Sequence, residues 1–116
     1  MKPERINLIV HIQQWEQLKL EAIRRRCNDE EVVKDAIELA TGHKNLILET
    51  LRRRLENASL EKTEKETKRI APRLSPETAT VTKLLSGAIG MTAPEFIKLS
   101  LEVYFDHKEQ AEQSKF

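Results

Sequence analysis

Residues 68–105 consist of a short basic segment followed by two apolar-periodic runs, and a helix-capping signal opens each run. Ser75 followed by Pro76 opens the first run, because Ser is a preferred N-cap and Pro is tolerated at the first helical position. Gly90 is a natural stop for that helix, and residues 92–95 form a capping box that opens the next one. This order of signals predicts an extended segment followed by two helices joined by a tight turn.

Side chains of two kinds alternate along residues 68–74, as they do on a β-strand. Three are apolar, and the three between them include two arginines: Ile70, Pro72 and Leu74 alternate with Arg69, Ala71 and Arg73. Pro72 lacks a backbone N–H, so a strand here fits only a sheet edge or a two-stranded ribbon. Such a strand would carry both arginines on one face.

A similar alternation occurs within residues 5–12. One face would be wholly apolar and the other mostly polar: Ile6, Leu8, Val10 and Ile12 alternate with Arg5, Asn7, Ile9 and His11. The β-branched content favours a strand. The alternative is a helix that begins here and continues through Trp15 and Leu18.

Apolar side chains spaced three and four residues apart predict three helices before the basic segment: residues 13–27, 30–42 and 44–58. We expect Asn28 to end the first helix in the left-handed conformation. Arg24 to Arg26 either complement the negative end of the helix dipole, which is the preferred interpretation, or contact a phosphate. Arg52 to Arg54 are expected on a solvated face of the third helix.

The helix after Ser75 has an apolar stripe that we expect to be buried, made of Val81, Leu84, Leu85 and Ala88. The helix after Thr92 is apolar nearly all round as far as Phe105, as expected of a helix at a dimer-like interface. The polar tail from Asp106 is expected to fray.

The two parts of the chain align as copies of one strand–helix–helix pattern. Ile12 aligns with Leu74 and Ile37 with Leu101, and the second offset is the larger, which implies a longer turn in the second copy. Residues 59–68 would extend a helix or act as a tether. We predict a mainly α fold with a short antiparallel two-stranded ribbon and three segments: a first unit over residues 1–42, a helical connector over 43–67, and a second unit with its tail over 68–116.

Composition limits the class of protein. The single cysteine, Cys27, excludes an internal disulfide and fits a reducing cytosol. No apolar run approaches the roughly 18 residues of a membrane span, and no signal peptide is visible. We therefore expect a cytoplasmic protein without membrane contact. The net charge of +1 means that any attraction to phosphate must come from local clusters of cations.

These features resemble the ribbon–helix–helix family of DNA-binding regulators. The resemblance covers roughly residues 68–105 and is carried by the strand end, the caps and the segment E-F-I-K: Arg73–Glu77, Leu84, Leu85, Gly90, Thr92, Glu95–Lys98, Tyr104 and Phe105. Residues 5–40 match the same pattern more weakly. The chain is thus similar to tandem members of the family, which contain two fused units.

The resemblance implies a sequence-specific repressor or antitoxin-like regulator that places a β-ribbon in the major groove of double-stranded DNA. Side chains on the outward strand faces would read base edges, and the N-terminus of the last helix would bind a phosphate. The base-facing candidates are Arg69, Arg73, Arg5, Asn7 and His11, and the phosphate-binding candidates are Thr92 and Ala93. The strands could pair within one chain or between chains. A homodimer or higher homo-oligomer is expected and, for an antitoxin-like member, a toxin partner.

Three features depart from the family pattern. Asp29, Glu30 and Glu31 suit a helix N-terminus but repel a phosphate. Ile9 occupies an outward position, where it could contact a thymine methyl, and Pro72 weakens the ladder. We therefore expect the second unit to make most of the DNA contacts.

The sequence lacks support for catalysis. His11, His43 and His107 are far apart and have no metal-ligand spacing with Cys27, and no Gly-rich phosphate loop is present. We expect no enzymatic activity, cofactor or metal. The alternative function is a helical protein–protein interaction module without DNA contact, in which residues 5–27 form one long helix.

Overall fold

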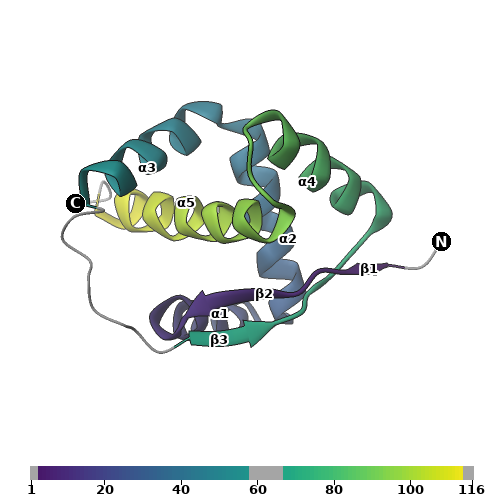
Figure 1. The fold of residues 1–116 in the computed structure, drawn as a ribbon. Coiled ribbons are helices and arrows are strands. Elements are labelled where there is room, and N and C mark those ends of the chain that lie inside the picture. The colour runs from purple at the N-terminus through teal and green to yellow at the C-terminus, as the bar shows by residue number, and fades with distance from the viewer. Residues whose placement is uncertain (1–2, 58–66, 114–116) are drawn as a thin grey trace.

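The computed structural model describes residues 3–57 and 67–113, with the backbone alone for residues 54–57 and 109–113. The fold is mainly helical, with short antiparallel strand pairs (Figure 1). The predicted tether or helix extension over residues 59–68 lies almost wholly outside the described residues. No described helix has both the length and the apolar character needed to cross a membrane. The elements in chain order are β1 (Glu4–Arg5), β2 (Leu8–His11), α1 (Ile12–Arg25), α2 (Asp29–Gly42), α3 (Lys44–Asn57), β3 (Thr67–Ile70), β4 (Arg73–Leu74), α4 (Pro76–Ala88) and α5 (Ala93–Gln113).

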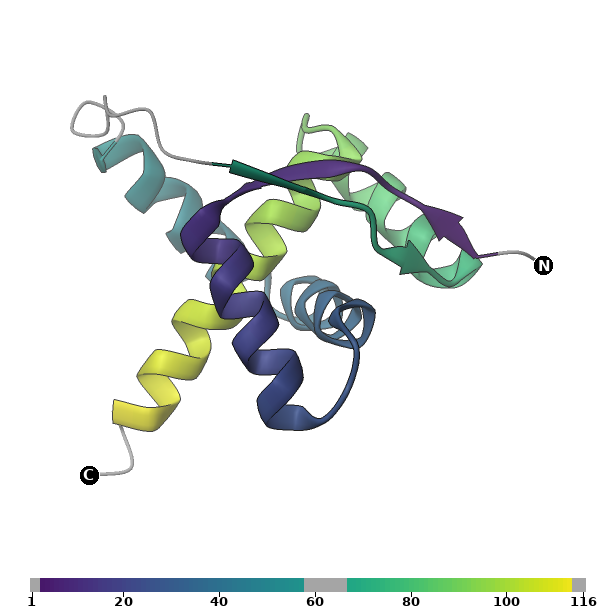
Figure 2. The ribbon, with the colours of Figure 1, turned by 90° about the horizontal axis from the view of Figure 1, so that it is seen from below.

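Strands from the two parts of the chain pair with one another in two short antiparallel ladders, β1 with β4 and β2 with β3, which follow one another along one two-stranded ribbon (Figures 1 and 2). The register places Glu4 and Arg5 opposite Leu74 and Arg73, and Leu8, Ile9, Val10 and His11 opposite Ile70, Arg69, Lys68 and Thr67. The ladder is interrupted at Pro72, which has no N–H to donate, although its carbonyl accepts a bond from the Ile6 N–H at 3.2 Å. The strand predicted near the N-terminus is confirmed, and a continuous helix over residues 5–27 is wrong. The strands pair within one chain.

Side-chain caps fix three of the helix starts. Ser75 Oγ accepts from the Thr78 N–H at 3.2 Å and Asn28 Oδ1 accepts from the Glu31 N–H at 3.0 Å. The predicted capping box is confirmed, because Thr92 Oγ1 accepts from the Glu95 N–H at 3.3 Å while the Glu95 carboxylate accepts from the Thr92 N–H at 3.4 Å.

The prediction that Asn28 ends α1 in the left-handed conformation is wrong. Arg26 adopts that conformation, with φ of 55°, and the Cys27 N–H bonds back to the Ala22 carbonyl at 3.0 Å. Gly90 has φ of 73° after α4, and the next N–H makes the corresponding bond to Ser86 at 2.8 Å. Asn28 follows the left-handed Arg26 by two positions and has another role, because its side chain caps α2.

The helix starts also correct the alignment of the two copies. Asn28 immediately precedes α2, and Thr92 immediately precedes α5. The number of residues from Asn28 to Thr92 equals the number from Arg26 to Gly90, the two left-handed residues. The first helices of the two units, which begin at Ile12 and Pro76, repeat that separation. One constant offset therefore relates the two copies. The two unequal offsets predicted from the sequence, and the longer turn in the second copy, are wrong.

The apolar stripe predicted for α4 is wrong except at Leu85, which is half-buried against the core. Leu84 is 68% exposed and Val81 is 37% exposed, whereas Thr82 and Ser86 are buried. Burial of these hydroxyls is possible because Thr82 Oγ1 donates to the Thr78 carbonyl at 2.8 Å and Ser86 Oγ donates to the Lys83 carbonyl at 3.0 Å. At the corrected offset, the buried residues of α4 match the inward-facing residues of α1: Ala79, Thr82 and Ser86 correspond to Trp15, Leu18 and Ala22.

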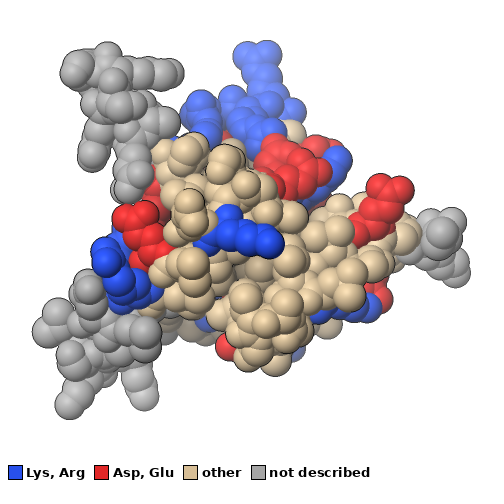
Figure 3. Space-filling view, turned by 90° about the horizontal axis from the view of Figure 1, so that it is seen from above, with Lys and Arg blue, Asp and Glu red and all other residues tan. Residues whose placement is uncertain are grey.

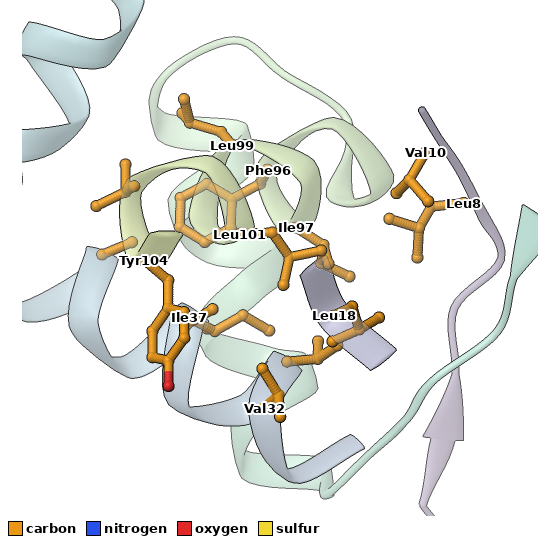
Figure 4. Close-up of a cluster of buried hydrophobic side chains, with 14 of the residues drawn as sticks. Leu8, Val10, Leu18, Val32, Ile37, Phe96, Ile97, Leu99, Leu101 and Tyr104 are labelled. Atoms are coloured by element: carbon orange, nitrogen blue, oxygen red, sulfur yellow. The ribbon is translucent and has the colours of Figure 1, made fainter. Parts of the chain in front are cut away.

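One hydrophobic cluster is shared by both strand–helix–helix units (Figure 4). α5 packs most extensively on α2, and its Phe96, Ile97 and Leu101 side chains are fully buried. Leu8 and Val10 close the cluster from the ribbon side. Each such side chain contributes about 1.5–3 kcal/mol on burial. The dimer-like interface expected for the last helix is thus formed within one chain.

The polar tail does not fray where expected, because α5 continues through Gln113. Arg53 of α3 pairs with Asp106 at 3.2 Å, and Lys108 pairs with Glu21 of α1. Arg52 is exposed, as expected of a solvated face, while Arg53 is half-buried by its ion pair. The Arg54 side chain lies outside the described residues.

Candidate nucleic-acid interface

The ribbon turns one face to the helices and the other to solvent. Residues opposite each other in an antiparallel pair share a face, so the register defines both faces completely. The inner face is largely apolar, with Leu8, Val10 and Leu74 buried, and Glu4 and Lys68 lie at its ends. We define the outer ribbon face as the eight outward residues: Arg5, Asn7, Ile9, His11, Thr67, Arg69, Ala71 and Arg73.

All five residues predicted to face DNA bases lie on the outer ribbon face and are exposed: Arg5, Asn7, His11, Arg69 and Arg73. Their positions follow from alternation along each strand, but their proximity follows from the register, which the sequence did not predict. Arg5 is opposite Arg73, and Arg69 is opposite Ile9. Candidates from both units therefore form one continuous surface.

This surface gathers positively charged side chains from both strands. Across the described residues, the guanidinium groups of Arg5, Arg69 and Arg73 form no ion pair. Glu4 is the one carboxylate within the four strands, and it pairs with Lys83 at 2.7 Å on the inner side. Like charges directly opposite each other destabilise a strand pair, so the arrangement of Arg5 beside Arg73 disfavours the free protein and favours an anionic ligand.

The dimensions of the ribbon also fit a nucleic acid. Two paired strands lie about 4.8 Å apart. The major groove of B-form DNA is about 12 Å wide and admits a two-stranded ribbon with its outward side chains against the base edges. Exposed arginines and an exposed amide, Asn7, are the side chains that make paired hydrogen bonds to guanine and to adenine.

The two helix N-termini that flank the ribbon differ in charge. At one end Glu30 of α2 accepts a hydrogen bond from the Arg73 N–H at 2.8 Å, and Asp29 beside it pairs with Lys19. The carboxylates of this acidic turn would repel a phosphate.

At the N-terminus of α5, the two predicted phosphate-binding residues differ in whether their backbone N–H group is available to a phosphate. The Thr92 N–H already bonds to Glu95, and Pro94 has no N–H. The Ala93 N–H is therefore the donor that this turn retains among the described residues. Thr92 would bind a phosphate only if the Glu95 side chain moved.

A buried charged cluster between α1 and α5 was not predicted. Glu21 is 6% exposed and accepts hydrogen bonds from Tyr104 Oη at 2.5 Å, from Arg24 at 2.8 and 3.0 Å, and from Lys108. The pKa of Tyr104 is raised to about 12, mainly because the hydroxyl is buried and secondly because it donates a hydrogen bond to Glu21. The sequence signal for burial was the position of Glu21, one helical turn after Leu18 on the same helix face.

Two arginines of the first arginine run take part in ion pairs at or near this cluster. Arg24 pairs with Glu21, while Arg25 pairs with Asp35 and donates to Tyr104 Oη at 3.3 Å. The hydrogen bond to Asp35 raises the pKa of Arg25. Arg25 therefore joins α1 to α2 and α5, while the pair of Arg24 with Glu21 lies within α1.

Two histidines that are distant in sequence lie together away from the ribbon. The rings of His43 and His107 are stacked, with centroids 6.3 Å apart. Within the part of the chain that the structure describes, no three or more His, Cys, Asp or Glu side chains are grouped so that they could hold a metal ion.

The face of the molecule away from the ribbon has a different charge distribution. Basic and acidic side chains lie around a central area in which few side chains are charged (Figure 3). The cations of the outer ribbon face, by contrast, have no carboxylate among them.

A comparison of the chain with protein-family models, curated proteins and solved structures finds no match. The assignment of function therefore depends on the chemistry of the outer ribbon face.

Proposed function

We propose that the chain is a sequence-specific DNA-binding regulator, similar to ribbon–helix–helix proteins, that places its outer ribbon face in the major groove. The observation that carries this proposal is a set of exposed arginines on one side of a two-stranded ribbon, which form no ion pair with any residue that the structure describes. Each bidentate contact between such an arginine and guanine, or between Asn7 and adenine, is worth about 1–3 kcal/mol of discrimination. Repression would follow from occupancy of the operator.

The charge distribution supports recognition by specific contacts over general attraction to DNA. The net charge is only +1, so non-specific binding should be weak. Local neutralisation of about three phosphates would make the logarithm of the binding constant fall with the logarithm of salt concentration, with a slope of about −3. A protein that bound DNA through its whole surface would show a steeper slope.

The test is fluorescence anisotropy with labelled duplexes, comparing random DNA with DNA from upstream of the gene, across a salt titration. A variant with Arg5→Ala, Arg69→Ala and Arg73→Ala should lose measurable binding. Lys44→Ala removes a positive charge from α3, on the opposite side of the molecule from the ribbon (Figure 1), and should bind normally. No binding by the native chain, or equal binding by the triple variant, would refute the proposal.

The homo-oligomer is a separate proposal. One chain already forms a complete ribbon and buries α5 against α2, so a homodimer requires an additional interface. Sedimentation equilibrium of the native chain measures this directly. A toxin partner stays a prediction.

The interaction-module alternative required a helix over residues 5–27. The ribbon contradicts that version of the alternative.

A further inference from the structure

We propose that the DNA site read by this chain is non-palindromic. In one half of the site Ile9 contacts a thymine methyl, and at the equivalent position of the other half Arg73 contacts the DNA. This inference rests on the proposed DNA binding through the outer ribbon face. It follows from a comparison of the two ends of that face.

The two ends are related by an approximate twofold axis through the ribbon. The two ladders on either side of the interruption share one register, with Arg5 opposite Arg73 and Ile9 opposite Arg69, and the same register places Asn7 opposite Ala71. The constant offset between equivalent helix starts and left-handed residues also makes Asn7 the equivalent of Ala71. The axis therefore passes between these two residues.

This axis relates two pairs of equivalent outward residues. The two members of one pair are of the same residue type, and those of the other pair differ. Arg5 is equivalent to Arg69, so each end has an arginine at this position. Ile9 is equivalent to Arg73, and both are exposed, Ile9 by 48%. One end of the ribbon thus presents two guanidinium groups, and the other presents one guanidinium group beside an aliphatic side chain.

The flanking helices add to this asymmetry. The acidic turn of α2, with Glu30 bonded to the Arg73 N–H, lies at the end that has two arginines. Its equivalent in α5 is Pro94, and the equivalent of Asp29 is Ala93. A phosphate is therefore better accepted at the end that carries Ile9.

A palindromic site would offer identical base edges to these unlike ends. Arginine pairs with the O6 and N7 acceptors of guanine, whereas an aliphatic side chain gains contact with the C5-methyl of thymine. Burial of one methyl group is worth about a fourfold change in affinity. The preferred site should therefore have more guanine in the half that faces Arg5 and Arg73, and a thymine at the position that faces Ile9.

The experiment is selection of bound duplexes from a randomised library by the full native chain, followed by sequencing. A non-palindromic motif is expected. An enriched palindrome would overturn the asymmetry while leaving DNA binding intact. Binding without enrichment would overturn specific reading by both ends, and no binding at all would overturn the proposed function with it.

Two reciprocal variants make the ends alike. Ile9→Arg gives both ends two arginines, and Arg73→Ile gives each end one arginine and one isoleucine. Each should shift the selected motif towards a palindrome, with gained guanine for Ile9→Arg and gained thymine for Arg73→Ile. Ile9 is half-exposed, so the fold should tolerate the change, and circular dichroism checks this. An unchanged motif for correctly folded variants would overturn the inference.

A chemical probe isolates the methyl contact. Replacement of the thymine facing Ile9 by deoxyuridine should weaken binding by the native chain about fourfold. Ile9→Ala should bind both duplexes equally. Equal binding of the two duplexes by the native chain would overturn the assigned role of Ile9.

Discussion

Arg5 lies directly opposite Arg73 on the exposed face of the ribbon, although one belongs to the first unit and the other to the second. The pairing merges the two strand–helix–helix units into one surface. From the sequence we expected the second unit to make most of the DNA contacts. In the structure, one arginine from each unit lies at the same level of the ribbon. Their contributions to binding should therefore be similar.

Arg5→Ala and Arg73→Ala should each weaken binding to the selected DNA site by about 1–3 kcal/mol, because each removes one base-reading side chain. Fluorescence anisotropy at fixed salt measures the change, with Lys44→Ala as the control for loss of one charge. Loss of binding in Arg73→Ala with none in Arg5→Ala would restore the division of roles expected from the sequence.

The corrected orientation of α4 leads to a prediction on stability. Leu18 is 1% exposed and Leu84 is 68% exposed, although both lie on the first helix of a unit. Leu18→Ala should lower the free energy of unfolding by about 2–5 kcal/mol, because it leaves a cavity. Leu84→Ala should change it by less than about 0.5 kcal/mol. Urea denaturation measures both, and similar losses would show that α4 buries the stripe that the sequence predicted.

The two left-handed residues should respond oppositely to substitution. A residue with a Cβ is strained in this conformation by about 1–2 kcal/mol, while Gly adds entropy to the unfolded chain. Arg26→Gly should therefore stabilise the protein by about 0.5 kcal/mol. Gly90→Ala should destabilise it by about 0.5 kcal/mol, because the strain outweighs the stabilisation that comes from a less flexible unfolded chain, and the added Cβ would meet nothing within 4 Å. Thermal unfolding monitored by circular dichroism distinguishes the two signs.

Tyr104 should make stability fall at high pH. Its pKa is raised to about 12 in the fold and is near 10 in an unfolded chain. The unfolded state therefore loses the proton first, and the stabilisation that is complete below pH 10 is lost as the pH rises through 12. The loss is roughly 2–3 kcal/mol.

Tyr104 is the single tyrosine, so tyrosinate absorbance reports its titration alone. A midpoint near 10 in the folded protein would contradict the buried hydrogen bond to Glu21. Tyr104→Phe is the matched control, because its stability should lack this component between pH 10 and 12.

Local signals in the sequence predicted the elements well. Alternation located the strands, and Ser75 and the capping box at Thr92 located the starts of α4 and α5, because these features depend on neighbours in sequence. The register of the ribbon could not be predicted this way, since the 5–12 and 68–74 segments are far apart in the chain.

Periodicity failed on α4 for a related reason. Its apolar stripe was visible, but its packing on α5 buries small and hydroxyl side chains, Thr82 and Ser86, whose polar groups are satisfied by the backbone of the helix itself. The cluster around Glu21 joins α1 to α5, so it depends on the tertiary arrangement. Both features require knowledge of which helices meet.

The most direct test of the proposed function is an NMR titration of the isotopically labelled chain with the selected duplex. DNA binding through the outer ribbon face predicts the largest amide shifts at Arg5, Asn7, Ile9, Arg69 and Arg73, and small shifts throughout α3. Shifts confined to α3 and α4, or no shifts at duplex concentrations that saturate binding in anisotropy, would contradict it.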